Sequence, residues 1–305
     1  MIITCEKCET RFNLNEKITE KSAFLVRCSR CNNVFTVYKS PQTEAPLLLK
    51  DEVKPFRDKI IAISNQKGGV AKTSTCLNLG ISMSLLKKRV LLVDFDVQSN
   101  LTISLGYKKT KSFYEILYSD TDSLSGVIKK TKYPNLWLIP SNSNMALLTK
   151  KNSNKINSGY ILRDKLNLIK DRFDQILIDT PPSIEFFTLN ALIASSFTII
   201  PSQCEYLSTH GINQVEKIVE IIKQKVDQDI DYKILITMYD AKNTASKVVY
   251  AKLKNKYKGK MFNTIIERDN KIQESQIVNL PVIYYDKESR SALQYLSLAK
   301  EILGE

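Results

Sequence analysis

Residues 59–74 read KIIAISNQKGGVAKTS, and this stretch decides the fold. An apolar run at 59–64 comes first, a glycine-containing turn follows, and a helix-like stretch, TCLNLGISMSLLKK, occupies 75–88. A strand, a glycine-rich loop and a helix in this order are typical of a phosphate-binding loop. The backbone amides of such a loop and the N-terminus of the helix face the same anion.

The loop departs from the usual spacing of such motifs. A standard phosphate-binding loop has glycine six residues before its lysine and glycine directly before it. Counted back from Lys72, those places hold Gln66 and Ala71, and a second lysine, Lys67, precedes the glycines. The motif therefore needs an explanation for two lysines and displaced glycines.

The remaining loop residues suit a nucleoside triphosphate with a magnesium ion. Gly68 and Gly69 let the backbone curl so that its amides face the phosphates. Lys72 can reach the β- and γ-phosphates, and the Thr73 hydroxyl can bind magnesium. Ala71 predicts a negative φ at its position, because a positive φ would strain alanine by about 1 kcal/mol.

Strand-like and helix-like stretches alternate after residue 58. Short apolar runs stand at 59–64, 89–94, 136–141, 175–180, 197–202 and 233–238. Helix-like stretches separate most of them, at 72–87, 159–171, 209–226 and 246–257, and a helix is expected near the C-terminus. Runs without strict alternation predict strands buried on both faces. We therefore expect an α/β fold with a mostly parallel sheet, helices on both faces, and ligands beyond the carboxyl ends of the strands.

Three aspartates follow these runs. Asp94 and Asp96 come at the end of the run at 89–94, and Asp179 ends the run at 175–180. We expect Asp94 near the metal shell, Asp96 beside the water that attacks the γ-phosphate, and Asp179 on the magnesium side. Either of the first two could instead cap a helix.

Four of the six cysteines lie in the first 31 residues. Cys5, Cys8, Cys28 and Cys31 form the pattern C-x2-C-x19-C-x2-C, which predicts a structural zinc site with four thiolate ligands. A redox pair or an iron–sulfur ligand set is the alternative. About 40 residues bury too little apolar surface to fold unaided, and zinc binding would supply the difference. Short strands are expected at 23–28 and 33–38.

The segment 1–38 resembles the short N-terminal zinc-ribbon family of bacterial proteins, through ITCEKCETRFNL and VRCSRCNNVFTV. A proline-containing linker is expected at 39–57 and the main domain at 58–305. Cys76 and Cys204 are interpreted as small packing residues.

Composition narrows the class of protein. The formal net charge is +13, which favours polyanionic partners, although a lysine-rich solvated surface would give the same number. No apolar run approaches the ~18 residues of a membrane span, and the charged N-terminus does not resemble a signal peptide. We therefore expect a cytoplasmic protein that does not enter the membrane.

Several motifs together resemble the ParA/MinD family of deviant Walker-A ATPases, most closely its ParA branch. They are KGGVAKTS (67–74), VLLVDFDVQSN (90–100), ILIDTPPS (176–183), TMYDAK (237–242) and the C-terminal PVIYYDKESRSALQYLSLAKEIL (281–303). The resemblance covers about 59–303. It implies ATP and magnesium as cofactors, in addition to zinc in the ribbon.

The resemblance also assigns roles to residues. It implies that Lys67 crosses an ATP-sandwiched homodimer to the partner's phosphates, where it would neutralise growing charge as an arginine finger does. It implies that Asp96 positions water and that Asp179 lies in the outer magnesium shell. The nucleotide is expected around Gly68, Gly69, Val70, Ala71, Lys72, Thr73 and Ser74.

The basic residues of the C-terminal half bear on a nucleic-acid partner. The ParA resemblance implies non-specific DNA binding through Lys242, Arg268 and Lys271. Further lysines between 242 and 260 could add to such a face, or could form only a solvated surface.

The function expected from the resemblance is a dimeric, nucleoid-associated ATPase switch for chromosome or plasmid partitioning, stimulated by a ParB-like partner. One alternative is an ATPase that positions a protein cargo, such as a flagellar or chemotaxis cluster, with the ribbon as adaptor. Another is a zinc adaptor with a degenerate ATPase, which the intact Lys67, Lys72, Asp96 and Asp179 disfavour.

Overall fold

The computed structural model describes residues 2–5, 7–8, 10–13, 23–38, 60–108, 110–117, 126–152, 158–183, 185–226 and 229–305. The chain divides into two compact units, Met1–Leu47 and Leu48–Glu305. This division falls within the linker predicted at 39–57, which lies outside the described residues.

The first unit contains two small antiparallel ladders. Strand β1 (Ile2–Thr4) pairs with β2 (Arg11–Asn13), and β3 (Ala23–Arg27) pairs with β4 (Val34–Tyr38). The second ladder confirms the two strands predicted on either side of the second cysteine pair. Each ladder ends in a tight turn, which places two cysteines close together.

The second unit is built on a seven-stranded sheet. Its strands are β5 (Ile60–Ile63), β6 (Val90–Asp94), β7 (Lys129–Lys130), β8 (Leu136–Ile139), β9 (Gln175–Asp179), β10 (Phe197–Ser202) and β11 (Asp231–Ile236), in the order β11-β10-β5-β9-β6-β8-β7. All neighbours are parallel except β7, which pairs antiparallel with β8. Each strand expected from an apolar run is present. In this sheet only β7 was not predicted, because its two lysines do not form the apolar run by which a buried strand is recognised.

Helices connect most of these strands. They are α1 (Lys72–Leu85), α2 (Asn100–Ser104), α3 (Phe113–Leu117), α4 (Ala146–Asn152), α5 (Ile161–Asn167), α6 (Phe186–Ala194), α7 (Ser208–Val226), α8 (Thr244–Lys256), α9 (Asn270–Ile277), α10 (Val282–Tyr285) and α11 (Arg290–Leu303). The expected helices at 72–87, 209–226 and 246–257 and near the C-terminus are confirmed as α1, α7, α8 and α11. The stretch at 159–171 holds α5 between two 3-10 turns.

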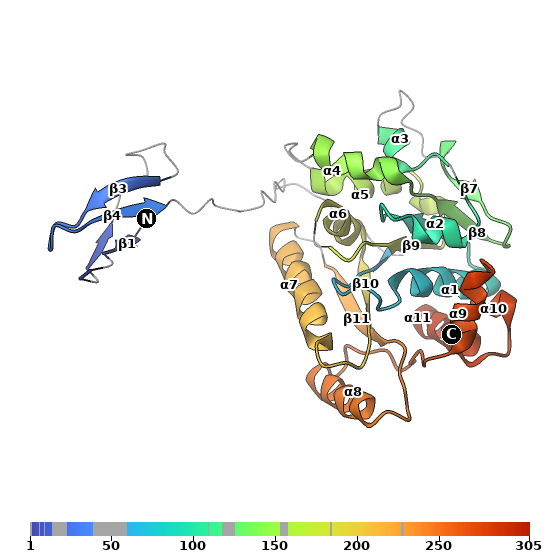
Figure 1. The fold of residues 1–305 in the computed structure, drawn as a ribbon. Helices are drawn as coiled ribbons and strands as arrows, with labels where there is room; N and C mark the ends of the chain where they lie inside the picture. Colours follow the sequence, from blue (N-terminus) through green and yellow to red (C-terminus); the bar gives the residue numbers. More distant parts are fainter. Residues whose placement is uncertain are drawn as a thin grey trace. The chain divides into compact units, whose positions relative to one another are not determined.

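Alternate residues of the central strands pack into two separate hydrophobic cores, one on each face of the sheet. In β5, Ile60 and Ala62 belong to the core shared with α5, α6 and α7, whereas Ile61 and Ile63 face the core shared with α1 and α11. Figure 1 shows α5 and α6 on one side of the sheet and α1 and α11 on the other. This arrangement is the α/β class predicted from the strand pattern.

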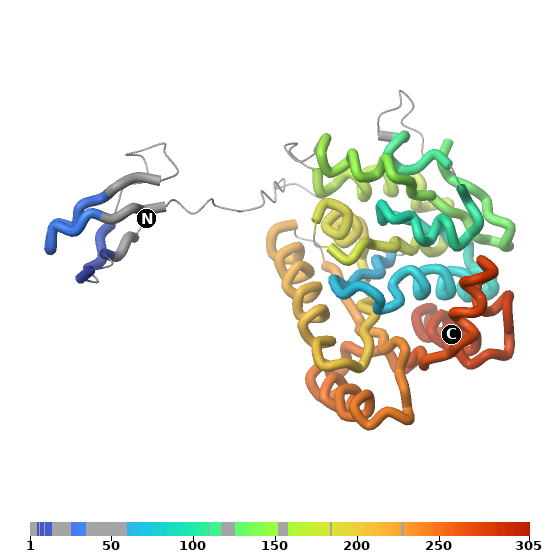
Figure 2. The backbone as a smooth tube through the Cα atoms, in the orientation of Figure 1, coloured from blue at the N-terminus to red at the C-terminus, as the bar shows by residue number. Residues whose placement is uncertain are grey.

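Helix α1 lies at the centre of the second core. The tube in Figure 2 runs from the loop after β5 into α1, and the C-terminal helices lie beside it. A Cβ atom at Gly80 would lie 2.5 Å from Leu92 Cδ2, so glycine lets α1 approach the sheet closely. Tyr295 of α11 is buried, and its hydroxyl lies 3.4 Å from the Thr75 hydroxyl of α1.

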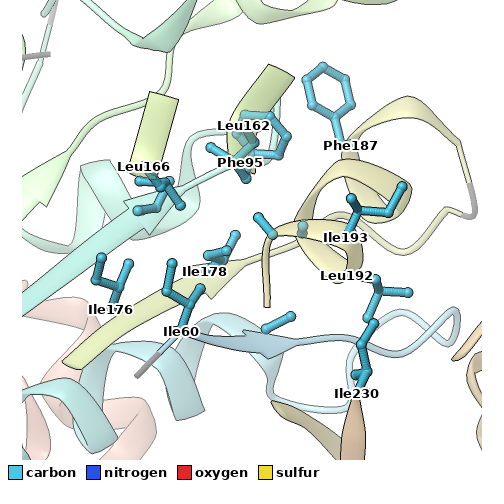
Figure 3. Packing of buried hydrophobic residues seen from close by; sticks show 14 of the residues in the cluster. Ile60, Phe95, Leu162, Leu166, Ile176, Ile178, Phe187, Leu192, Ile193 and Ile230 are labelled. Atoms are coloured by element: carbon cyan, nitrogen blue, oxygen red, sulfur yellow. The ribbon is translucent and has the colours of Figure 1, made fainter. Parts of the chain in front are cut away.

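Phe95 joins the other core to the end of β6. Its ring makes edge-to-face contacts with Phe113 at 5.4 Å and Phe187 at 5.3 Å between centroids. Figure 3 shows Phe95 beside Leu162 and Phe187, above the β9 residues. Because Phe95 stands between two site aspartates, Asp94 and Asp96, its burial fixes the backbone that carries them.

We expect Phe95→Ala to lower the free energy of unfolding by about 3–5 kcal/mol, because it leaves a cavity beside the rings of Phe113 and Phe187. Urea unfolding followed by Trp137 fluorescence measures this. Trp137 is the only tryptophan, and it packs on Phe173 in the same unit. The matched control is Leu168→Ala, at a side chain 66% exposed. A loss for Phe95→Ala no larger than that of the control would contradict the role of the Phe95 cluster.

Candidate functional site

The loop between β5 and α1 curls through two left-handed residues. Gly69 has a φ of 74° and Ala71 a φ of 67°. The prediction of a negative φ at Ala71 is therefore wrong. The chain must turn sharply directly before α1, whose N-cap is Ala71, and this turn outweighs the strain at a Cβ-bearing residue.

Hydrogen bonds from three neighbouring strand ends hold the loop. Thr180 after β9 donates its hydroxyl to the Ile63 carbonyl at 2.8 Å. Gln203 after β10 donates Nε2 to the Gly69 carbonyl at 3.0 Å. Thr237 after β11 donates its hydroxyl to the Val70 carbonyl at 3.2 Å, and the Val70 side chain is buried. These three carbonyls are thus occupied by side chains of the same chain, which leaves backbone amides of the loop for a ligand.

A large cavity of about 1350 Å³ opens in front of this loop. It lies at the carboxyl edge of the sheet, as expected for an α/β protein. Its lining includes Gly68, Gly69, Ala71, Lys72, Thr73, Ser74, Asp96, Gln203, Glu205, Met238, Asn243, Arg268, Gln273 and Gln276. The volume is ample for a nucleotide.

Lys72 is the buried cation of the cavity. Its side chain is 7% exposed, and Nζ donates to the Lys67 carbonyl at 3.0 Å. Burial lowers the pKa of the Lys72 ammonium, and the charges of Asp179 and Asp96 oppose this shift. A cation held between carboxylates and a curled loop is suited to bind phosphate oxygens.

The two aspartates around Phe95 have different surroundings. Asp96 lines the cavity, and its Oδ1 accepts a hydrogen bond from the Gln98 amide at 2.9 Å. Asp94 does not line it. Its Oδ2 accepts bonds from the Thr102 amide at 2.8 Å and the Thr102 hydroxyl at 2.6 Å. Burial raises the Asp94 pKa to about 6. These contacts hold Asp94 against the first turn of α2, whose N-cap is Ser99, and its position near the metal shell stays a prediction.

Asp179 is a buried carboxylate, and neither of its oxygens has a hydrogen-bond partner of good geometry among the described residues. Burial raises its pKa well above the usual value. The charge of Asp94 adds to this shift, while the Thr73 hydroxyl and the Lys72 ammonium oppose it. An unpaired carboxylate beside a hydroxyl and a cavity fits a hydrated magnesium ion, which prefers oxygen ligands and retains water. Thr73 and Asp179 are therefore the residues that could serve such an ion.

Lys67 does not line the cavity of its own chain, but its ion-pair partner Glu205 does. Glu205 precedes α7. The Lys67 side chain is 32% exposed and that of Glu205 56% exposed. The structure therefore brings Lys72, Thr73 and Asp96 together at the cavity and places Lys67 at its rim.

The three predicted DNA-binding residues differ in their contacts. Lys242 is exposed at the turn before α8, and Arg268 is exposed and lines the cavity. The Lys271 ammonium is paired with Glu274 at 2.8 Å, which raises the Lys271 pKa. Lys242 and Arg268 thus have no ion-pair partner in the described part of the chain. The role of all three residues in DNA binding stays a prediction.

Sequence reasoning missed several residues of the site. Gln203 and Glu205 follow β10 in the stretch QCEY, Met238 follows β11, and Gln276 of α9 donates to the Ser74 hydroxyl at 2.9 Å. The first three could have been found by applying the strand-end rule to each apolar run. Gln276 lies near the loop only through tertiary packing, which carries no local sequence signal.

The four N-terminal cysteines meet in the first unit. The Cys5 and Cys31 sulfurs lie 3.6 Å apart, as do those of Cys8 and Cys28, and all four lie within 4.8 Å of one another. Each pair closes a turn through its backbone; the Cys5 amide donates to Thr10 at 3.0 Å. Four convergent sulfurs fit a tetrahedral zinc ion. Cys76 and Cys204 are buried in the two cores of the second unit, as expected of packing residues.

Comparison with known families divides the chain in the same way. The sequence model of a family described as an AAA domain matches residues 58–232, and that of a zinc-ribbon domain matches residues 1–36. The sporulation initiation inhibitor protein Soj of Bacillus subtilis is 39% identical over 248 residues, which cover 80% of this chain and 98% of Soj. The chromosome partitioning protein ParA of Myxococcus xanthus is 34% identical over 249 residues, which cover 80% and 88%.

A solved structure extends the likeness to three dimensions. Cobyrinic acid a,c-diamide synthase from Mycobacterium smegmatis, with bound ADP and magnesium, superposes with a TM-score of 0.70 at 30% identity. The match covers 80% of this chain and 94% of that one. With the two-lysine loop, the cavity and the buried carboxylates in place, the chain belongs to the ParA/MinD family of P-loop ATPases, in its ParA/Soj branch, and carries an N-terminal zinc ribbon.

Proposed function

We propose that the chain is an ATP-dependent dimeric switch of the ParA type. ATP closes a homodimer, the closed dimer binds DNA without sequence preference, and slow hydrolysis releases it. The cargo would be a chromosome or plasmid in the cytoplasm, with a ParB-like protein as the stimulating partner. Among the described residues no helix is long and apolar enough to cross a bilayer.

The position of Lys67 is the observation that carries this proposal. The ammonium lies at the cavity rim and outside the lining, while Lys72 occupies the phosphate end of the cavity. A second copy facing the rim would bring its own Lys67 toward this cavity. Hydrolysis would then depend on dimerisation, because the second positive charge would come from the partner.

The other site residues suit the remaining tasks. Lys72 and the loop amides would hold the phosphates, and Asp96 would orient water, since its carboxylate lines the cavity. Magnesium, where bound, would supply positive charge at the phosphates. Thr73 would bind that ion directly and Asp179 through water.

Exposed lysines in α8 and in the turn after it support a nucleic-acid partner, and with Lys242 and Arg268 they are called the basic face. Lys247, Lys252 and Lys258 are exposed, and none has an ion-pair partner in the part of the chain that the structure describes. Lys242 and Arg268 lie near the same end of the unit, at the turns that flank the cavity. Such side chains bind phosphates as point charges and read no base sequence.

The zinc ribbon favours a second candidate function. Soj is matched over 98% of its length by 80% of this chain, so about a fifth of the chain lies outside the match. That portion offers an added binding module. The alternative is therefore an ATPase that positions a protein cargo, such as a flagellar or chemotaxis cluster, through the ribbon. Locating the tagged protein in cells, with a pull-down on the ribbon, separates the two functions.

Single substitutions test the switch. Asp96→Ala is expected to retain ATP binding and lose hydrolysis at least about a hundredfold, and so accumulate as an ATP-bound dimer on DNA. Lys67→Ala is expected to retain ATP affinity within about a factor of three and to stay monomeric. ATP hydrolysis, size-exclusion chromatography with light scattering, and DNA co-sedimentation measure these outcomes. Hydrolysis by Asp96→Ala at the rate of the unsubstituted chain would refute its assignment.

Lys242→Glu tests the basic face. We expect the affinity of the ATP-bound dimer for random DNA to fall, and the slope of log K against log salt to decrease by about one, because one phosphate contact is lost. Lys217→Glu on α7 changes the charge equally at another exposed position. Equal losses for both variants would show that only net charge matters.

Cysteine substitutions test the metal site. The purified chain is expected to hold about one zinc ion, and Cys5→Ser or Cys28→Ser to lose it, because three thiolates leave the tetrahedron incomplete. Cys204→Ser is the control and should keep zinc. ATP binding should persist in all three variants. A full zinc content in Cys5→Ser would contradict the four-cysteine assignment.

A further inference from the structure

Asn65 is a buried polar residue that the reaction described above does not use. It directly precedes the phosphate-binding loop and is 2% exposed. Its Nδ2 donates to the Pro201 carbonyl of β10 at 2.7 Å. Its Oδ1 accepts a hydrogen bond from the Lys67 amide at 2.9 Å. Asn65 thus ties the backbone of Lys67 to the central sheet.

Gly211 in the first turn of α7 closes the other side of this side chain. A Cβ atom at position 211 would lie 2.5 Å from Asn65 Oδ1 and 3.4 Å from Cγ. The 2.5 Å contact with Oδ1 is far shorter than a Cβ atom tolerates, so glycine lets α7 pack directly on Asn65. Sheet, helix and loop therefore meet at one amide group.

The contacts continue from the Lys67 backbone to both lysine side chains. The Lys67 carbonyl accepts the hydrogen bond of Lys72 Nζ at 3.0 Å. The Lys67 ammonium pairs with Glu205, whose amide donates to Ser208 Oγ at the start of α7 at 3.0 Å. The direction in which Lys67 leaves the loop is thus set by Asn65 on one side and by the start of α7 on the other.

We propose that Asn65, with Gly211 packed against it, is the positioning residue of Lys67. It fixes the peptide from which the lysine side chain leaves, so that the ammonium projects over the rim toward a second copy. This inference rests on the proposed role of Lys67. Asn65 itself touches no phosphate, because it is buried behind the loop and does not line the cavity.

We expect substitution of Asn65 to reduce the rate of ATP hydrolysis while leaving nucleotide affinity nearly unchanged. Asn65→Ala should keep the affinity for a fluorescent ATP analogue within about threefold, since Lys72 and Thr73 remain in place. It should reduce hydrolysis by about tenfold or more, because a small displacement of a charged group is enough for that loss. Gly211→Ala should give the same result, as the added methyl group displaces Asn65. His210→Ala, at the exposed neighbouring residue, is the matched control and should change both quantities less than twofold.

A double-substitution cycle on the full-length chain decides whether Asn65 acts through Lys67. If it does, Asn65→Ala added to Lys67→Ala causes no further loss of the single-turnover rate or of ATP-driven dimerisation. Multiplicative losses in the double variant would overturn the proposal, and so would an unchanged rate in Asn65→Ala or Gly211→Ala when Lys67→Ala is inactive. A fully active Lys67→Ala would instead refute the function proposed for Lys67. If Asn65→Ala does not fold, judged by its thermal melt, Gly211→Ala carries the comparison.

Discussion

The structure depends on charged side chains held out of water at the carboxyl edge of the sheet. Lys72, Asp94 and Asp179 are all buried there, and burial of charge is unfavourable unless partners compensate it. Asp94 is compensated within the chain by Thr102 and by the Asp96 amide. Lys72 has a neutral carbonyl as its hydrogen-bond partner, and Asp179 has no partner of good geometry in the part of the chain that the structure describes. A triphosphate with magnesium supplies the charges that would satisfy both.

The fold makes this arrangement possible because a parallel sheet collects its functional ends on one edge. Residues after β9, β10 and β11 donate hydrogen bonds to three carbonyls of the loop or of β5, and β6 delivers Asp96. The same segment after β10 carries Glu205 and leads into α7, whose first turn packs on Asn65. The same backbone segments therefore form the nucleotide site and the rim of the cavity. The rim is where we expect a second copy of the chain to bind. A change at the site or at the rim is transmitted to the other through packed atoms.

Much of this was predictable from the sequence, for physical reasons. Strands buried on both faces appear as apolar runs, and cysteine pairs at fixed spacing indicate a metal site, so the sheet and the four-cysteine site could be predicted. Of the strands in the first unit, β3 and β4 were predicted, whereas β1 and β2 were not. The conformation of Ala71 was predicted wrongly because the turn before α1 is set by the whole loop and not by the residue's own preference. The contact of Asp94 with α2 depends on Thr102, eight residues later, which spacing alone does not reveal. Gly211 and Gln276 reach the site only through packing.

The central claim is that Lys67 acts on the nucleotide of the partner. Mixing two inactive variants, Lys67→Ala and Asp96→Ala, tests it directly. In a mixed dimer, the Lys67→Ala subunit keeps its own Asp96 and receives Lys67 from its partner, so one complete site forms. Each mixed dimer holds one complete site of two, so the mixture should recover hydrolysis that neither variant shows alone, at no more than half the rate of the unsubstituted dimer. If Lys67 acts within its own chain, no complete site forms in any dimer, and a mixture as inactive as its components would contradict the account.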